Sequence, residues 1–338
     1  MKKFIALAAA LLAAFIFFGC SNSVEVKFVD MNWVLAGDYE RCLYSAEIHN
    51  GLTGGEKISY TDPSLSEMVL TFEKIEGGLA RLTMDLTVTY VKHPPFAKSE
   101  NAAKEKVDYT DCTDTVHSEI IFNGYSQDFN PISVKKTVSL ETSKKFDKTA
   151  EGLSADKSFS AEFTYPVGKQ AGTGKYTDAA GSETALKIKS KSLKNTFDNE
   201  QIYYLVSAFL CGTHDEMNEP ALGYGKQYKT FNLADHCSYG TGAANYSFAV
   251  KDAPRADYYD ITADEIAEVT ASFTQGQPLN MYYSLTKNVK IGDSQKPVRK
   301  FLMLGCEQKT NSDISKTLSV STYILKDYSP ARPAVAAD

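Results

Sequence analysis

Hydrophobic and polar residues alternate along much of the chain beyond residue 23, and a period of two is typical of β-strands that bury one face. The clearest example is a predicted hairpin with its turn at Gly77-Gly78. Apolar residues alternate along both arms of this hairpin: Met68, Leu70, Phe72, Leu82, Met84, Leu86, Val88 and Tyr90. The pattern therefore predicts an antiparallel sheet with one face on a core and the other in water.

One segment breaks the period of two and predicts an α-helix near residues 199–210. Asp198 is a good N-cap, and Gln201 stands at the position that completes a capping box. Four apolar residues then share one helical face: Ile202, Leu205, Val206 and Phe209. A second, short helix is expected from Thr262, because Glu265 follows it three residues later.

Beyond residue 279 the alternation returns and predicts a C-terminal three-stranded meander. Its strands cover residues 279–291, 298–306 and 318–325. Together these patterns predict a mainly β fold of antiparallel sheets, either a curved half-barrel or a sandwich, with one packed helix.

The length of 338 residues allows one large domain or two ordinary ones. The composition divides the chain into a signal peptide at 1–19, an N-terminal β-rich part at 20–165, a flexible loop or linker at 166–194, a helix with the meander at 195–328, and a disordered tail at 329–338. The two β-rich parts are either separate or joined in one continuous domain.

The N-terminus has the organisation of a secretory signal peptide. Lys2 and Lys3 precede an apolar run at residues 4–18, and Gly19-Cys20 follows. The run is too short to span a hydrocarbon core comfortably, since a spanning helix needs about 20 apolar residues. The sequence therefore predicts export.

Gly19-Cys20 is similar to the lipobox of bacterial lipoprotein precursors, in which a small residue precedes the cysteine to be acylated. Phe17 and Phe18 depart from the usual Leu and small residue of that family, which puts the efficiency of cleavage in question. The resemblance implies a lipoprotein of the cell envelope, held on the exported side of a membrane by fatty acyl chains such as palmitate on Cys20. The alternatives are an uncleaved N-terminal anchor and an ordinary signal with a chance cysteine.

The charge of the chain limits its partners. The net charge is -6, and removal of Lys2 and Lys3 with the signal brings it to about -8. An acidic body argues against nucleic acid as a partner and disfavours a body that lies flat on anionic lipid.

Candidate metal ligands are Cys211, His214 and Cys237, with His236 beside them. Two thiolates and two imidazoles suit tetrahedral zinc. However, His236 and Cys237 are adjacent and would point to opposite faces of a strand. We therefore favour buried thiols, or a single bridge between Cys211 and Cys237, and we predict no cofactor.

Tyrosine occurs 20 times and forms three doublets. In a strand, one ring of each doublet points outward, where a rigid amphipathic ring can contact a glycan or a protein. Tyr204, Tyr259 and Tyr282 are the candidate ligand contacts. The alternative is a role in the core and the ordinary sheet surface.

The sequence leans against an enzyme and names no catalytic residue. It contains no Gly-x-Ser-x-Gly elbow, no Lys-Thr-Gly motif, no phosphate-binding loop and no dinucleotide fingerprint.

The segment Phe197-Asp198-Asn199-Glu200-Gln201, followed by an apolar helix and preceded by a long sheet, is similar to the half-barrel of lipoprotein-carrier-like envelope domains. The resemblance implies a groove for an apolar ligand or acyl chain between helix and sheet.

The predicted function is thus a membrane-anchored envelope lipoprotein with a non-catalytic, β-rich body that binds a ligand or partner. The ligand is a glycan, a protein or an apolar molecule. The alternatives are an envelope hydrolase with a dispersed active site and a purely structural surface lipoprotein.

Overall fold

The computed structural model describes residues 28–51, 56–91, 111–126, 129–146, 156–166, 171–188, 196–213, 231–237, 240–273, 278–311 and 318–332. The expected signal peptide, Cys20, His214 and the end of the expected tail lie outside the described residues. No helix in the described ranges is long and apolar enough to cross a bilayer.

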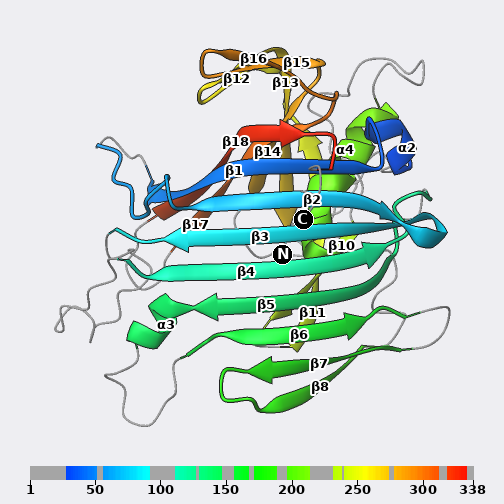
Figure 1. The fold of residues 1–338 in the computed structure, drawn as a ribbon, viewed down its shortest axis with the longest axis vertical. Coiled ribbons are helices and arrows are strands. Elements are labelled where there is room, and N and C mark those ends of the chain that lie inside the picture. The colour runs from blue at the N-terminus through cyan, green and yellow to red at the C-terminus, as the bar shows by residue number, and fades with distance from the viewer. Residues whose placement is uncertain are drawn as a thin grey trace, which may run out of the picture.

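The first half of the chain forms the front layer of Figure 1. Its strands are β1 (Tyr39–Asn50), β2 (Glu67–Ile75), β3 (Leu79–Thr89), β4 (Thr113–Phe122), β5 (Pro131–Leu140), β6 (Phe159–Thr164), β7 (Gly172–Asp178) and β8 (Glu183–Ile188). Each pairs antiparallel with the next. Short helices α2 (Met31–Val34) and α3 (Glu141–Phe146) flank this layer.

The second half begins with β9 (Thr196–Asp198), the 3-10 turn η4 (Asn199–Gln201) and helix α4 (Ile202–Thr213). The remaining strands are β10 (Phe231–Cys237), β11 (Gly240–Val250), β12 (Arg255–Tyr258), β13 (Ile261–Phe273), β14 (Leu279–Ser284), β15 (Asn288–Ile291), β16 (Ser294–Pro297), β17 (Met303–Asn311) and β18 (Leu318–Ser329). Strands β14, β17 and β18 form the predicted meander, and the β15–β16 hairpin is inserted in it.

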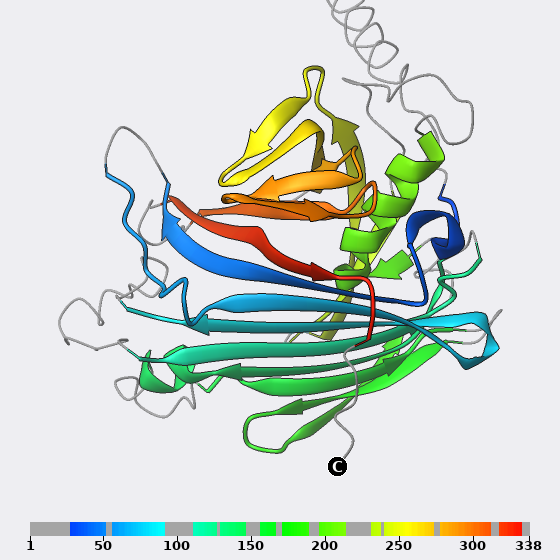
Figure 2. The same cartoon turned by 45° about the horizontal axis from the view of Figure 1, so that its top comes forward.

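All strands belong to one sheet because β1 also pairs with β18. From β18 the sheet continues through β17, β14, β13, β11 and β10 to β9, and among the described strands only the β9–β10 pair is parallel. The sheet curves strongly, and β10 and β11 run across the concave side of the first layer (Figures 1 and 2). The prediction of a mainly antiparallel β fold with one packed helix is confirmed.

The β9 end of this curved sheet meets strands β5 and β6 of the first layer through side chains. Tyr165, just after β6, donates a hydrogen bond to Asp198 Oδ2 of β9 at 2.8 Å, and Lys136 of β5 lies 2.8 Å from Glu200 Oε1. Gln201 Nε2 donates to the carbonyl of Phe129 at 3.1 Å. Among the described residues no backbone ladder joins β9 to β5 or β6, so we call this contact the side-chain seam.

Helix α4 fills the space inside the curve. The predicted capping box is present, with Asp198 Nα donating to Gln201 Oε1 at 2.8 Å. The helix is buried on all sides, because residues beyond the predicted apolar face are also enclosed: Tyr204, Ala208, Leu210 and Cys211. One core cluster includes residues from both halves, such as Leu70, Phe122 and Met281.

Two expectations need correction. Residues 166–194, expected as a loop or linker, contain β7 and β8. These strands are rich in Gly, Thr and Lys and are only partly buried, so they lack the apolar alternation that predicts a strand. The helix expected from Thr262 is part of β13. Pairing with β12, β14 and β15 outweighs the local capping signal there.

Candidate functional site

A buried ion pair between Glu40 and Arg299 forms the base of the candidate site. Arg299 Nε donates to Glu40 Oε2 at 2.5 Å, and Nη2 donates to Oε1 at 2.9 Å. Both side chains are almost completely enclosed. Burial would lower the pKa of Arg299, but the facing carboxylate outweighs burial and raises it. The two planar groups therefore form a charged, bidentate contact.

Local structure directs both side chains inward. Glu40 occupies an inward position of β1, in line with the buried Cys42 and Tyr44. Arg299 lies between β16 and β17, where its Nη1 donates to the carbonyls of Phe301 at 2.7 Å and Lys300 at 3.2 Å. Phe301 holds a left-handed backbone with φ of 58°, which is uncommon for a residue with a side chain. The short segment is thus curled around the guanidinium.

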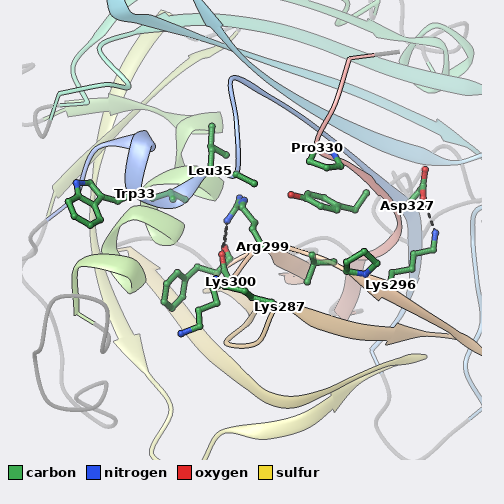
Figure 3. A pocket seen from close by; sticks show the side chains of 14 residues that line it. Trp33, Leu35, Lys287, Lys296, Arg299, Lys300, Asp327 and Pro330 are labelled. Carbon is green, nitrogen blue, oxygen red and sulfur yellow. Dashed lines mark hydrogen bonds and ion pairs between the residues drawn. The ribbon is translucent and has the colours of Figure 1, made fainter. Parts of the chain in front are cut away.

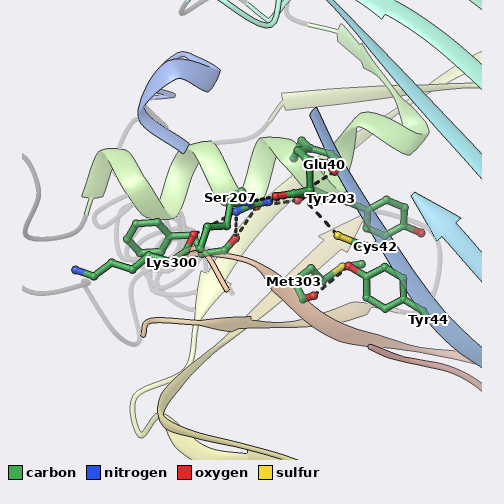
Figure 4. A network of polar contacts seen from close by, with 10 residues as sticks. Glu40, Cys42, Tyr44, Tyr203, Ser207, Lys300 and Met303 are labelled. Atoms are coloured by element: carbon green, nitrogen blue, oxygen red, sulfur yellow. Dashed lines mark hydrogen bonds and ion pairs between the residues drawn. The ribbon is translucent and has the colours of Figure 1, made fainter. Parts of the chain in front are cut away.

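The pair continues into a polar network on helix α4 (Figure 4). Tyr204 donates its hydroxyl to Glu40 Oε1 at 3.0 Å, and Ser207 donates to the carbonyl of Phe301 at 2.8 Å. Burial, followed by the Glu40 carboxylate, raises the pKa of Tyr204. The network therefore joins β1, α4 and the segment before β17.

This network does not suit nucleophilic catalysis. The Cys42 sulfur lies 3.8 Å from Glu40 Oε1, but burial and the carboxylate raise the pKa of the thiol, whereas a nucleophilic cysteine needs a lowered one. The cavity beside these groups holds only ≈ 10 Å³, about the space of one water molecule. The groove expected between helix and sheet is filled by side chains at this place.

Above the ion pair lies an open groove of ≈ 620 Å³, which is within the size range of small-molecule sites. One side comes from α2 and the residues after it, the floor from residues 296–301, and the other side from the end of β18 (Figure 3). Apolar and aromatic side chains form much of the wall: Trp33, Val34, Leu35, Pro297, Val298, Phe301, Tyr328 and Pro330. We call this cavity the α2 groove.

The charges of the α2 groove oppose those of the whole chain. Its lining has four cationic side chains, Lys287, Lys296, Arg299 and Lys300, and one anionic side chain, Asp327. Lys296 Nζ lies 2.8 Å from Asp327 Oδ1. Four cationic side chains against one anionic side chain in the lining contrast with the net charge of -6 of the whole chain. The groove can therefore accept an anionic group beside apolar surface.

The structure separates the three candidate tyrosines. Tyr204 is buried in the Glu40 network, and Tyr282 is buried under Tyr258, with ring centroids 4.2 Å apart. Neither has the exposed ring that the prediction required, because Tyr204 belongs to the enclosed helix α4 and Tyr258 of β12 stacks on Tyr282. Tyr259 is 43% exposed and lies at the hairpin turn with φ of 50°. The three do not form one surface.

The candidate metal ligands are also only partly visible. Cys211 is buried, and its thiol donates to the Trp33 carbonyl at 3.6 Å. The side chain of Cys237 lies outside the described part of the structure, so a bridge between the two cysteines stays a prediction. Cys237 is the last residue of β10, and His214 lies outside the described residues. Within the described part of the chain, no group of three or more His, Cys, Asp or Glu side chains is placed to hold a metal ion.

Sequence reasoning missed the groove and its base. The inward orientation of Glu40 could have been predicted, because Glu40 extends the alternation of Cys42 and Tyr44 towards the N-terminus. Its partner Arg299 lies 259 residues away in a segment without periodicity, so no local signal pairs them. Only the curved sheet brings Trp33, Arg299 and Tyr328 to one cavity.

The chain matches no protein-family model, and no curated protein matches it. Among solved structures it is similar to a β-barrel-like protein of the domain of unknown function DUF1849 from Brucella abortus, with 8% sequence identity and a TM-score of 0.39. That similarity covers 90% of this chain and 100% of the other.

Proposed function

We propose that this chain is a membrane-anchored lipoprotein of the cell envelope whose β-rich body binds, without catalysis, an anionic ligand with an apolar part. The observation that carries the proposal is the α2 groove, a ≈ 620 Å³ cavity with cationic and aromatic walls. Lys287 and Lys300 supply positive charge, while Trp33, Leu35 and Tyr328 supply contact area. The lipobox-like Gly19-Cys20 supports the anchor.

Ligand binding is tested by titration calorimetry with decyl phosphate, and decyltrimethylammonium serves as a probe with the same chain and the opposite charge. We expect the phosphate to bind and the ammonium not to. The double variant Lys287→Ala/Lys300→Ala lowers the affinity for decyl phosphate by roughly tenfold or more, since charged hydrogen bonds contribute about 1.5–3 kcal/mol each. Lys290→Ala is the matched control, because Lys290 is an exposed lysine outside the groove lining. Equal binding of both amphiphiles would remove the anionic specificity.

The anchor is tested separately by labelling cells with a radioactive fatty acid. We expect label on the wild-type protein and none on Cys20→Ala. Equal labelling of the two proteins would contradict acylation at Cys20 and would leave the groove's ligand preference as an independent question.

A further inference from the structure

The only tryptophan of the chain stands at the rim of the α2 groove. Trp33 is 59% exposed, although Met31 and Val34 of the same short helix are buried and hold it in place. Asp30 caps this helix by accepting a hydrogen bond from the Asn32 backbone at 2.9 Å. The ring is therefore displayed by a fixed element (Figure 3). Tryptophan in this setting suits the interface between water and a membrane, where an amphipathic ring is favoured.

The cations of the groove accompany this ring. Lys287 is exposed, and Lys296 and Lys300 are half-exposed. A cationic site in an acidic chain is attracted to anionic lipid headgroups, while the remaining acidic surface is repelled by them. The overall charge therefore disfavours contact through most of the body but permits contact through this face.

The position of the predicted anchor points to the same face. Cys20 precedes Phe28, the first described residue, by eight residues, and α2 begins three residues later. Eight residues span at most about 29 Å when fully extended. An acylated Cys20 thus keeps the α2 side of the body within a short distance of the bilayer.

We propose that the α2 groove is a docking site for the headgroup of an anionic phospholipid of the protein's own membrane, with Trp33 in the interfacial layer. This inference rests on the proposed function, because it names the source of the anionic ligand. The lipid phosphate lies near Lys287 and Lys300, and its acyl chains remain in the bilayer. Arg299 contributes charge from below while its hydrogen bonds stay with Glu40 and the backbone.

The sole tryptophan gives a direct measurement. The mature chain with Cys20→Ala, which has no acyl anchor, is mixed with vesicles of phosphatidylcholine alone or with about 30% phosphatidylglycerol. We expect a blue shift of Trp33 emission, and quenching by brominated acyl chains, only with the anionic vesicles. Lys287→Ala/Lys300→Ala lowers the partition coefficient roughly 10- to 30-fold, and Lys290→Ala leaves it unchanged.

Two outcomes separate this inference from the proposed function. Decyl phosphate that binds in solution, together with no emission change on anionic vesicles, would overturn membrane docking and leave an anionic ligand from another source. If the protein binds neither decyl phosphate nor the anionic vesicles, both proposals are overturned. Vesicle flotation of Trp33→Phe provides a second readout, with a loss of about tenfold expected because an interfacial tryptophan is removed. Flotation equal to wild type would contradict a role for the ring at the interface.

Discussion

Two buried ion pairs lie among the described residues, and they differ in the charges around them. Beneath the α2 groove, one guanidinium faces one carboxylate, Arg299 against Glu40. At the side-chain seam, Lys136 pairs with the buried Glu200, and a second buried carboxyl group, Asp198, lies beside Glu200. A buried charge is tolerated when it is paired and hydrogen-bonded. The first site satisfies this condition with two ionised groups.

At the seam, this condition is met by a proton on one of the two carboxyl groups. Burial, which the Lys136 ammonium offsets only in part, raises the pKa of Glu200 to about 8, and the neighbouring Asp198 carboxyl group acts in the same direction as burial. Two carboxyl groups at close distance commonly share one proton for this reason. The comparison teaches that the groove base is a fixed charged unit, whereas the seam changes its charge near neutral pH.

The largest expected effect is on the balanced pair. Arg299→Met leaves the Glu40 carboxylate buried without its partner and should lower the free energy of unfolding by about 3–5 kcal/mol. Glu40→Gln should cost a similar amount, and the double variant should cost clearly less than the sum of both. Urea denaturation of the double-mutant cycle measures this coupling. Additive losses would show that the two groups do not depend on each other.

A smaller effect is expected at the seam. Lys136→Met removes the ammonium, but Glu200 can remain protonated and donate to Asp198, so we expect a loss of about 1–3 kcal/mol. Denaturation of Lys136→Met beside Lys135→Met, an exposed neighbour on β5, isolates the effect of burial. A loss as large as that of Arg299→Met would mean that both carboxyl groups are ionised in the folded protein.

The pH dependence should distinguish the two pairs. Glu200 has a raised pKa, so the folded state binds more protons than the unfolded state between the ordinary value of 4.5 and about 8. The contribution of the Glu200 carboxyl group to the free energy of unfolding is complete below pH 4.5. It decreases as the pH rises to 8, by at most about 1.4 kcal/mol per pH unit. Denaturation from pH 5 to 9 should show a shallower decline in Glu200→Gln than in wild type. Equal slopes for the two proteins would contradict a proton at the seam.

The smallest effect on stability is expected for the rim of the groove. Lys287→Ala/Lys300→Ala should change the free energy of unfolding by less than about 1 kcal/mol, since surface substitutions contribute little. The same variant should lose decyl phosphate binding. Thermal denaturation and calorimetry on one sample compare the two properties. Strong destabilisation would show that these lysines support the fold rather than the ligand.

Much of the fold could be predicted because its signals are local. The alternation of Met68, Leu70 and Phe72 predicts a strand, and Asp198 with Gln201 predicts the start of α4. These local signals failed to predict strands that are only partly buried or that depend on pairing with distant segments. Strands β7 and β8 contain few large apolar residues, and the acidic start of β13 resembles a helix N-terminus.

The sequence by itself determined the class of fold, the position of the helix and the prediction of an acyl anchor, because periodicity, capping and the N-terminal motif act over short distances. Tertiary structure alone decided which charges meet. It paired Glu40 with Arg299, gathered Lys136, Asp198 and Glu200 at the seam, and placed Trp33 beside a cationic groove. These contacts depend on how one sheet curves around α4, and no local pattern in the chain encodes that curvature.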